Sequence, residues 1–298
     1  MNKPGANRTV TARKKRCGAG GDVKTMKKSP LQDASGFSLV ELLTVVAITG
    51  IVMTGIFAVF RAQQTAHLTN SQTAEIQQNL RAGLYMVERD ARLAGYSHSD
   101  NPDATITQAT RTRFRFTWDD SENTWGNDPV EEIAFGMGPS HDADDDGEAD
   151  DGLGALGRSL DGGAFNPIAN NIQAIAFAYA FDSDRDKKLD TVTPGGDIVM
   201  WAYDDDGDDN LDTLAEAEAI AANGGAAIAD VPLDRIRAVR IWLLARSRRP
   251  ITGHEDNRTY ALPGNTISGG GDAFMRRSMI STIKCRNMGL RPETARGD

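Results

Sequence analysis

Hydrophobic and polar positions follow three successive patterns along the chain. From Phe37 to Phe60 run 24 residues with a single charged side chain, Glu41. A helix rises ~1.5 Å per residue, so this segment would measure ~36 Å and could cross a bilayer core of ~30 Å. The apolar residues then step by three or four positions, which predicts that the helix continues to Gly95 with one apolar face. That face comprises Ile76, Leu80, Leu84, Val87, Ala91 and Ala94.

The third pattern is a series of short runs rich in β-branched and aromatic residues, typical of strands. Together with the long helix they predict an α+β fold, in which the helix packs against an antiparallel β-sheet. A capping box at residues 213–216 predicts one further short helix, ending at Asn223-Gly224. The predicted strands are Thr112–Trp118, Glu131–Met137, Ile172–Phe181, Asp197–Tyr203, Arg235–Ala245 and Ser278–Lys284.

Glu41 is the unusual residue of the apolar segment. An ionisable side chain inside an apolar span costs on the order of 2–3 kcal/mol and usually marks a functional partner. Residues 1–36, which precede the segment, hold nine Lys or Arg and two Asp, a net charge of +7. This charge predicts that residues 1–36 stay cytoplasmic while the rest of the chain crosses the membrane.

A basic leader, Gly36, Phe37 and a glutamate at the fifth apolar position together resemble the class III leader of type IV prepilins and pseudopilins. The resemblance implies that prepilin peptidase cuts between Gly36 and Phe37 and that the new amino terminus is methylated. In a filament of parallel helices, the amine of Phe37 can neutralise Glu41 of a neighbouring subunit, which would set the register of assembly. Met26 would begin a shorter leader of the same kind, so the start codon stays open between Met1 and Met26.

Charge is divided unequally over the rest of the chain. Residues 119–230 carry four basic and 28 acidic residues, whereas residues 231–298 carry thirteen basic and six acidic residues. Such an acidic middle favours cations or basic partners. Three of its segments share the pattern D-x-D-x-D-x-x-x-D, and the second and third align further at an offset of 22, which indicates a duplicated strand-plus-loop unit. The twelve aspartates are Asp142, Asp144, Asp146 and Asp150; Asp182, Asp184, Asp186 and Asp190; and Asp204, Asp206, Asp208 and Asp212.

Calcium is the ligand predicted for these loops, because it prefers six to eight oxygen ligands that alternate carboxylates can supply. The loops resemble the first nine positions of an EF-hand or thrombospondin-type calcium loop, but they lack the acid at position twelve. Gly147 supplies the turn glycine of the first copy, while Arg185 and Lys187 should weaken the second and Gly207 stands at position four of the third. The expected dissociation constant is about 10⁻⁴–10⁻³ M. The alternative is a solvated acidic surface without a bound ion.

No arrangement of residues predicts catalysis or an organic cofactor. The G-x-G-x-x-G match at 152–157 follows an acidic run that would repel a pyrophosphate, and the histidines lack zinc-site spacing. Cys285 lies in strand-like sequence and is predicted to be buried. We interpret the arginines between Arg235 and Arg249 as strand-edge charges paired with the acidic middle, in preference to a nucleic-acid surface.

Residues 80–96, 239–247 and 276–287 resemble PilW-type minor pilins. The resemblance implies a structural and assembly subunit of a type IV pilus, held in the inner membrane by one span and incorporated into the surface pilus. Its partners would be other pilins and prepilin peptidase. The alternatives are a J-type pseudopilin of type II secretion and a membrane-anchored calcium-dependent binding protein or adhesin. The expected parts are a removed leader (1–36), a transmembrane and filament-core helix (37–60), its amphipathic continuation (61–96) and a periplasmic α+β domain (97–298) with acidic insertions near 138–153 and 182–230.

Overall fold

The computed structural model of the protein describes residues 36–97, 103–119, 130–193, 196–225 and 227–289. The predicted leader before Gly36, which includes Met1 and Met26, lies outside the described residues. The chain divides into two compact units, residues 1–57 and 58–298. Helix α1 (Leu39–Ala91) contributes its first residues to one unit and the remainder to the other. Among the described residues, strands occur in the second unit alone.

Within the second unit, α1 packs on the sheet through the predicted apolar face. All six residues of that face are buried, which confirms the prediction. Gly83 brings the helix close to the sheet, because a Cβ at this position would lie 3.0 Å from the Cβ of Ala169. The helix ends at Ala91, earlier than predicted, and Gly95 takes a left-handed conformation (φ 71°) in the turn that follows.

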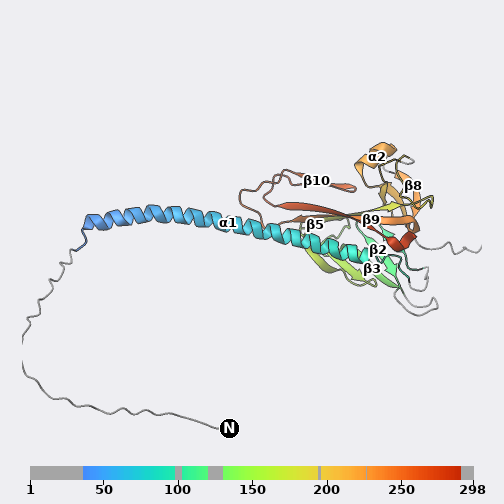
Figure 1. The fold of residues 1–298 in the computed structure, drawn as a ribbon, viewed down its shortest axis with the longest axis horizontal. Helices are drawn as coiled ribbons and strands as arrows, with labels where there is room; N and C mark the ends of the chain where they lie inside the picture. The colour runs from blue at the N-terminus through green and yellow to red at the C-terminus, as the bar shows by residue number, and fades with distance from the viewer. Residues whose placement is uncertain (1–35, 98–102, 120–129, 194–195, 226, 290–298) are drawn as a thin grey trace, which may run out of the picture. The chain divides into compact units, whose positions relative to one another are not determined.

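Within the described residues the main sheet has ten strands, and all of its strand pairs are antiparallel, as predicted for the α+β fold. Figure 1 shows helix α1 running along this sheet within the second unit. Strands β1 to β8 are paired in chain order, β9 pairs with the opposite edge of β5, and β12 pairs with β9. A separate hairpin is formed by β10 and β11. The strands are β1 (Ile106–Ala109), β2 (Phe114–Trp118), β3 (Glu131–Met137), β4 (Gly154–Leu160), β5 (Asn166–Phe181), β6 (Trp201–Tyr203), β7 (Asn210–Leu214), β8 (Ala227–Pro232), β9 (Ile236–Arg246), β10 (Thr259–Leu262), β11 (Asn265–Ser268) and β12 (Arg276–Lys284).

Strand β5 is the longest strand and lies at the branch point of the sheet. Its first half pairs with β4 and its last residues pair with β6 along the same edge, while β9 occupies the other edge from Ile172 onward. The large side chains of Ile175, Phe177 and Tyr179 alternate with alanines, and all of them are buried. This alternation places large groups on one face of the strand and small ones on the other.

Each of the six predicted strands overlaps an observed one, and the described part of the chain contains six further strands that were not predicted. The fourth prediction was too long, since β6 begins only at Trp201. The capping box was wrong: residues 213 and 214 belong to β7, and helix α2 (Ala217–Asn223) has Glu216 as an N-cap without a side-chain cap. Glu216 instead forms an ion pair with Arg240 of β9. Cys285 is buried as predicted, and burial raises the pKa of its thiol to about 12.

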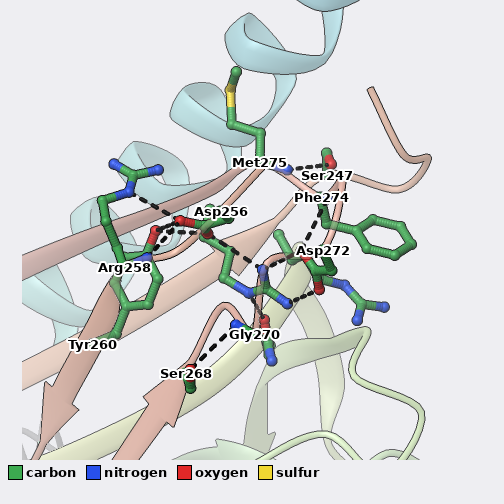
Figure 2. A network of polar contacts seen from close by, with 12 residues as sticks. Ser247, Asp256, Arg258, Tyr260, Ser268, Gly270, Asp272, Phe274 and Met275 are labelled. Atoms are coloured by element: carbon green, nitrogen blue, oxygen red, sulfur yellow. Dashed lines mark hydrogen bonds and ion pairs between the residues drawn. The ribbon is translucent and has the colours of Figure 1, made fainter. Parts of the chain in front are cut away.

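A buried ion-pair network fastens the β10–β11 hairpin to the sheet (Figure 2). Arg276, at the start of β12, donates to Asp256 (3.3 Å), to Asp272 (2.7 and 2.6 Å) and to Gln173 of β5 (2.8 Å). Tyr260 of β10 donates to Asp256 as well (3.0 Å). Burial of Asp256 would raise the pKa of its carboxyl, but the hydrogen bonds from Arg258, Tyr260 and Arg276 outweigh it and lower the pKa. The carboxylate is therefore charged inside the protein and depends on its donors.

Replacing Arg276 with methionine should lower the free energy of unfolding by about 3–5 kcal/mol, because Asp256 would keep a buried charge without its buried cationic partner. The measurement is urea denaturation followed by tryptophan fluorescence. Arg277→Met is the matched control, since Arg277 is the next residue and is exposed. Equal losses in the two variants would contradict the structural role of the network.

Candidate functional site

Three acidic loops carry the predicted metal ligands, and we name them loop 1 (142–150), loop 2 (182–190) and loop 3 (204–212). Loop 1 lies along β5 between the parts of that edge paired with β4 and β6: the amide of Ile175 donates to the carbonyl of Gly147 (2.8 Å), and the amide of Ala149 donates to that of Gln173 (2.8 Å). Loop 2 directly follows β5, and loop 3 directly follows β6. The sheet therefore holds the second half of loop 1 and the starts of loops 2 and 3.

The three loops share one pattern of hydrogen bonds, as their sequence repeat predicts. In each, the first aspartate accepts a hydrogen bond from the amide at position six, at 3.0 Å in loop 1, 3.2 Å in loop 2 and 3.1 Å in loop 3. In each, the last aspartate accepts from the amide at position two, at 3.1, 3.2 and 3.2 Å. The first and last carboxylates thus close each loop on itself.

Positions four and six adopt a left-handed backbone in all three loops. Glycine occupies position six in loop 1 (Gly147) and position four in loop 3 (Gly207), so each glycine stands where φ is positive, at 80° and 81°. Loop 2 has Arg185 and Lys187 at these positions, with φ of 64° and 68°. A non-glycine residue in the left-handed conformation raises the free energy by about 1–2 kcal/mol. Loop 2 has two such residues and loops 1 and 3 have one each, so loop 2 has the most strained backbone.

Three carboxylates converge in each loop, so that each could hold a metal ion. Their nearest oxygens lie within 4.8 Å of one another, as calcium coordination requires. The fourth predicted ligand of each loop, namely Asp150, Asp186 and Asp212, lies outside its cluster. The clusters are Asp142, Asp144 and Asp146; Asp182, Asp184 and Asp190; and Asp204, Asp206 and Asp208.

The first aspartate of each loop is buried. Asp142, Asp182 and Asp204 are 1%, 2% and 2% exposed. Burial raises the pKa of Asp142 to about 6, although the amides of Gly147 and Asp146 oppose the shift, and burial also raises the pKa of Asp204. One oxygen of Asp182 (Oδ1) has no hydrogen-bond partner among the described residues. A cation would compensate these buried negative charges.

Arginines of the carboxy-terminal strands neutralise part of the negative charge of the acidic middle, as the sequence predicts. Arg237 of β9 approaches Asp182 (Nε to Oδ2, 3.7 Å), Arg240 pairs with Glu216, and Arg246 donates to the carbonyl of Asp151 (3.4 Å). The sequence did not identify which acid each arginine meets. That assignment depends on the pairing of β5 with β9.

The first unit holds the second candidate site, around Glu41. Helix α1 is long and apolar enough to cross a membrane, judged by length and composition. Its residues from Leu39 to Phe60 are exposed on all sides, including the carboxylate-bearing Glu41. A helix that is apolar all round requires a membrane or other helices to cover it. Gly36 and Phe37 precede the helix and are also exposed.

Comparison with protein families assigns both regions. Residues 31–57, which include Gly36, Phe37 and Glu41, match the prokaryotic N-terminal methylation motif. Residues 158–287, from β4 to the end of β12, match the family described as Type IV Pilus-assembly protein W. Over these two ranges the chain resembles type IV prepilin-like proteins of the PilW type. Loops 2 and 3 fall inside the match to the PilW family, and loop 1 lies before it.

Solved structures include a comparable protein from Thermus thermophilus. This type IV-like pilin shares 13% sequence identity with the PilW-type chain, with a TM-score of 0.39, and the match covers 72% of the present chain and 97% of the other. No curated protein matches the chain significantly.

The glycines of loops 1 and 3 should differ in their tolerance of alanine. Gly147 and Gly207 have nearly the same φ, but a Cβ at Gly147 would lie 2.6 Å from the carbonyl oxygen of Ile175, whereas a Cβ at Gly207 meets open space. We expect Gly207→Ala to cost about 1–2 kcal/mol for the left-handed backbone alone, and Gly147→Ala to cost clearly more. Thermal unfolding without calcium measures the difference, and equal midpoints would contradict the close approach of loop 1 to β5.

Proposed function

We propose that this PilW-type protein is a minor pilin, a non-enzymatic structural and assembly subunit of a type IV pilus. The observation that carries the proposal is Glu41, the single charge between Phe37 and Phe60, in an exposed apolar helix whose first residues lie inside the methylation motif. Prepilin peptidase would cut between Gly36 and Phe37. Residues 37–60 would then anchor the subunit in the inner membrane and enter the filament core, with residues 61–96 continuing the helix and 97–298 facing the periplasm.

Glu41 has a specific role in this proposal. Once the leader is removed, the amine of Phe37 in one subunit and Glu41 in its neighbour offset each other's charge inside the apolar core of the filament. Subunits that are out of register leave both charges unpaired. An anchored binding protein or adhesin that never enters a filament would need neither the cleavage nor the carboxylate.

Cells that carry Glu41→Ala as the only copy should lose most surface pili while protein secretion continues normally. The reason is that the amine of Phe37 would have no partner in the filament core. Electron microscopy counts the pili, and immunoblotting measures secreted proteins and the level of the subunit. Thr44→Ala is the control, because it changes a polar residue one helical turn away without removing a charge.

Two other outcomes would contradict the proposal, and each would support a different function. Normal pili with failed secretion would identify a J-type pseudopilin of type II secretion. Normal pili with normal secretion would remove the filament role and leave the anchored calcium-dependent binding protein or adhesin as the function.

We further propose that loops 1 and 3 bind calcium and that loop 2 binds it more weakly. Their buried first aspartates and converging oxygens support the choice, as do the glycines at left-handed positions in loops 1 and 3. Loop 2 should bind calcium more weakly for two reasons. Its backbone is strained at Arg185 and Lys187, and the positive charges of these side chains repel a divalent cation. Calcium would stabilise the surface of the domain from which these loops extend.

Calorimetry at roughly 5 mM calcium should detect binding with dissociation constants of about 10⁻⁴–10⁻³ M. Asp142→Asn and Asp204→Asn should each remove one site, because each replaces the buried carboxylate of its cluster. Asp230→Asn removes an exposed acid outside the loops and should change nothing. Absence of any calcium-dependent heat would leave the loops as a solvated acidic surface.

A further inference from the structure

Strand β12 forms a long and regular edge of the main sheet. It pairs with β9 through nine consecutive residues without a register shift. The amide of Cys285 donates to the carbonyl of Arg237, and the amide of Ser247 donates to that of Met275, so the odd-numbered residues from 275 to 285 face β9. In an antiparallel pair the hydrogen-bonding direction alternates along the strand, so the even-numbered residues direct their amides and carbonyls outward.

The outward backbone groups of β12 have no partner among the described residues. Ser278, Ile280 and Thr282 are exposed, and Ile280 is 56% exposed although its side chain is large and apolar. Unpaired edges of this kind template the addition of another strand, and proteins usually shield them. Beyond the buried Arg276 at the start of β12, residues 277–284 contain no proline, bulge or buried charge that would do so.

Other edges of the described sheet are shielded. Strand β8 is short, has an irregular register against β7 and ends in Pro232, which cannot donate a hydrogen bond. Strand β1 has four residues and a register shift, and the amide of Asp204 donates to the carbonyl of Ala109 just before the parallel bridge between Thr110 and Asp204. The open edge of β12 therefore contrasts with the rest of the sheet.

The charge around β12 indicates what could occupy the edge. From residue 276 to 289 the chain carries four basic residues and no acidic one. Arg276 is buried in its own ion pairs, which leaves Arg277, Lys284 and Arg286 exposed. The nearby carboxylate of Glu88 is engaged by the hydroxyl of Ser281 (2.5 Å), and that of Glu216 is paired with Arg240. Two copies of β12 side by side would bring like charges together, which disfavours self-pairing.

We propose that β12 is a docking edge for an extended, acidic segment of a different protein, which adds to the sheet as an eleventh strand. Backbone hydrogen bonds to Ser278, Ile280 and Thr282 would provide affinity, and an apolar side chain against Ile280 with acids near Arg277 and Lys284 would provide selectivity. The edge belongs to the second unit, so this proposal goes beyond the filament role and does not depend on Glu41.

Two ten-residue fluorescent peptides test the proposal against the full-length chain in detergent micelles. One alternates valine with glutamate, and the other alternates valine with lysine. Fluorescence anisotropy should show the acidic peptide binding at least about tenfold more tightly. The acidic peptide with N-methylated amides at alternate residues should not bind, because it lacks the donors that strand addition needs.

Ile280→Pro should abolish binding of the acidic peptide, since it removes an outward amide that β9 does not use. Ile280→Thr keeps that amide and should retain part of the binding. Circular dichroism verifies that both variants remain folded. Equal binding of the acidic and basic peptides, unchanged binding of the N-methylated peptide, unchanged binding by a folded Ile280→Pro variant, or no binding of the acidic peptide would each overturn the proposal.

Discussion

The second unit depends on the backbone pairing of a single strand, β5. Both of its edges are occupied: β4, loop 1 and β6 take one edge in succession, and β9 takes the other. From Ile172 to Phe181 almost every residue is buried, so no backbone group of this stretch can rely on water. The alternation of alanine with large side chains then determines what packs on each face of the strand. Large groups meet the aromatic residues of β2 and the helix side, and the small face accepts the β10–β11 hairpin.

The acidic loops follow from the same constraint. Loops 2 and 3 begin where β5 and β6 end, and loop 1 lies against the edge of β5. The first aspartate of each loop is therefore buried, whereas most other residues of the loops are partly or fully exposed. Amides of the loop itself satisfy most oxygens of these buried carboxylates, which explains the identical hydrogen-bond pattern in three places. These hydrogen bonds do not fully offset the effect of burial, so the pKa of Asp142 stays raised. The fold therefore places buried carboxylates at three fixed points, namely beside β5, after β5 and after β6.

Much of this arrangement could be predicted from sequence, and the exceptions have physical causes. The helical face and the apolar strands were predictable because periodicity follows burial. Strand β4 is rich in glycine, and the start of β5 contains Pro167, so both acquire their structure from pairing with each other. The capping box failed because cross-strand pairing engages Thr213 and an ion pair engages Glu216. Arg276 could not be recognised as a buried residue, since its partners Asp256 and Asp272 meet it only after the hairpin folds back.

Side-chain hydrogen bonds connect loop 1, on one edge of β5, with β12, which lies beyond β9 on the other edge. Gln173 of β5 donates to Glu148 in loop 1 (3.5 Å) and accepts from Arg276 at the start of β12 (2.8 Å). Loop 1 and the start of β12 are therefore joined through Gln173 of β5 by one hydrogen-bonded path, and Arg276 links that path to the hairpin. Such a path is rigid because every member is buried or paired. A calcium ion in loop 1 and a strand added to β12 would thus bind near opposite ends of the path from Glu148 to Arg276.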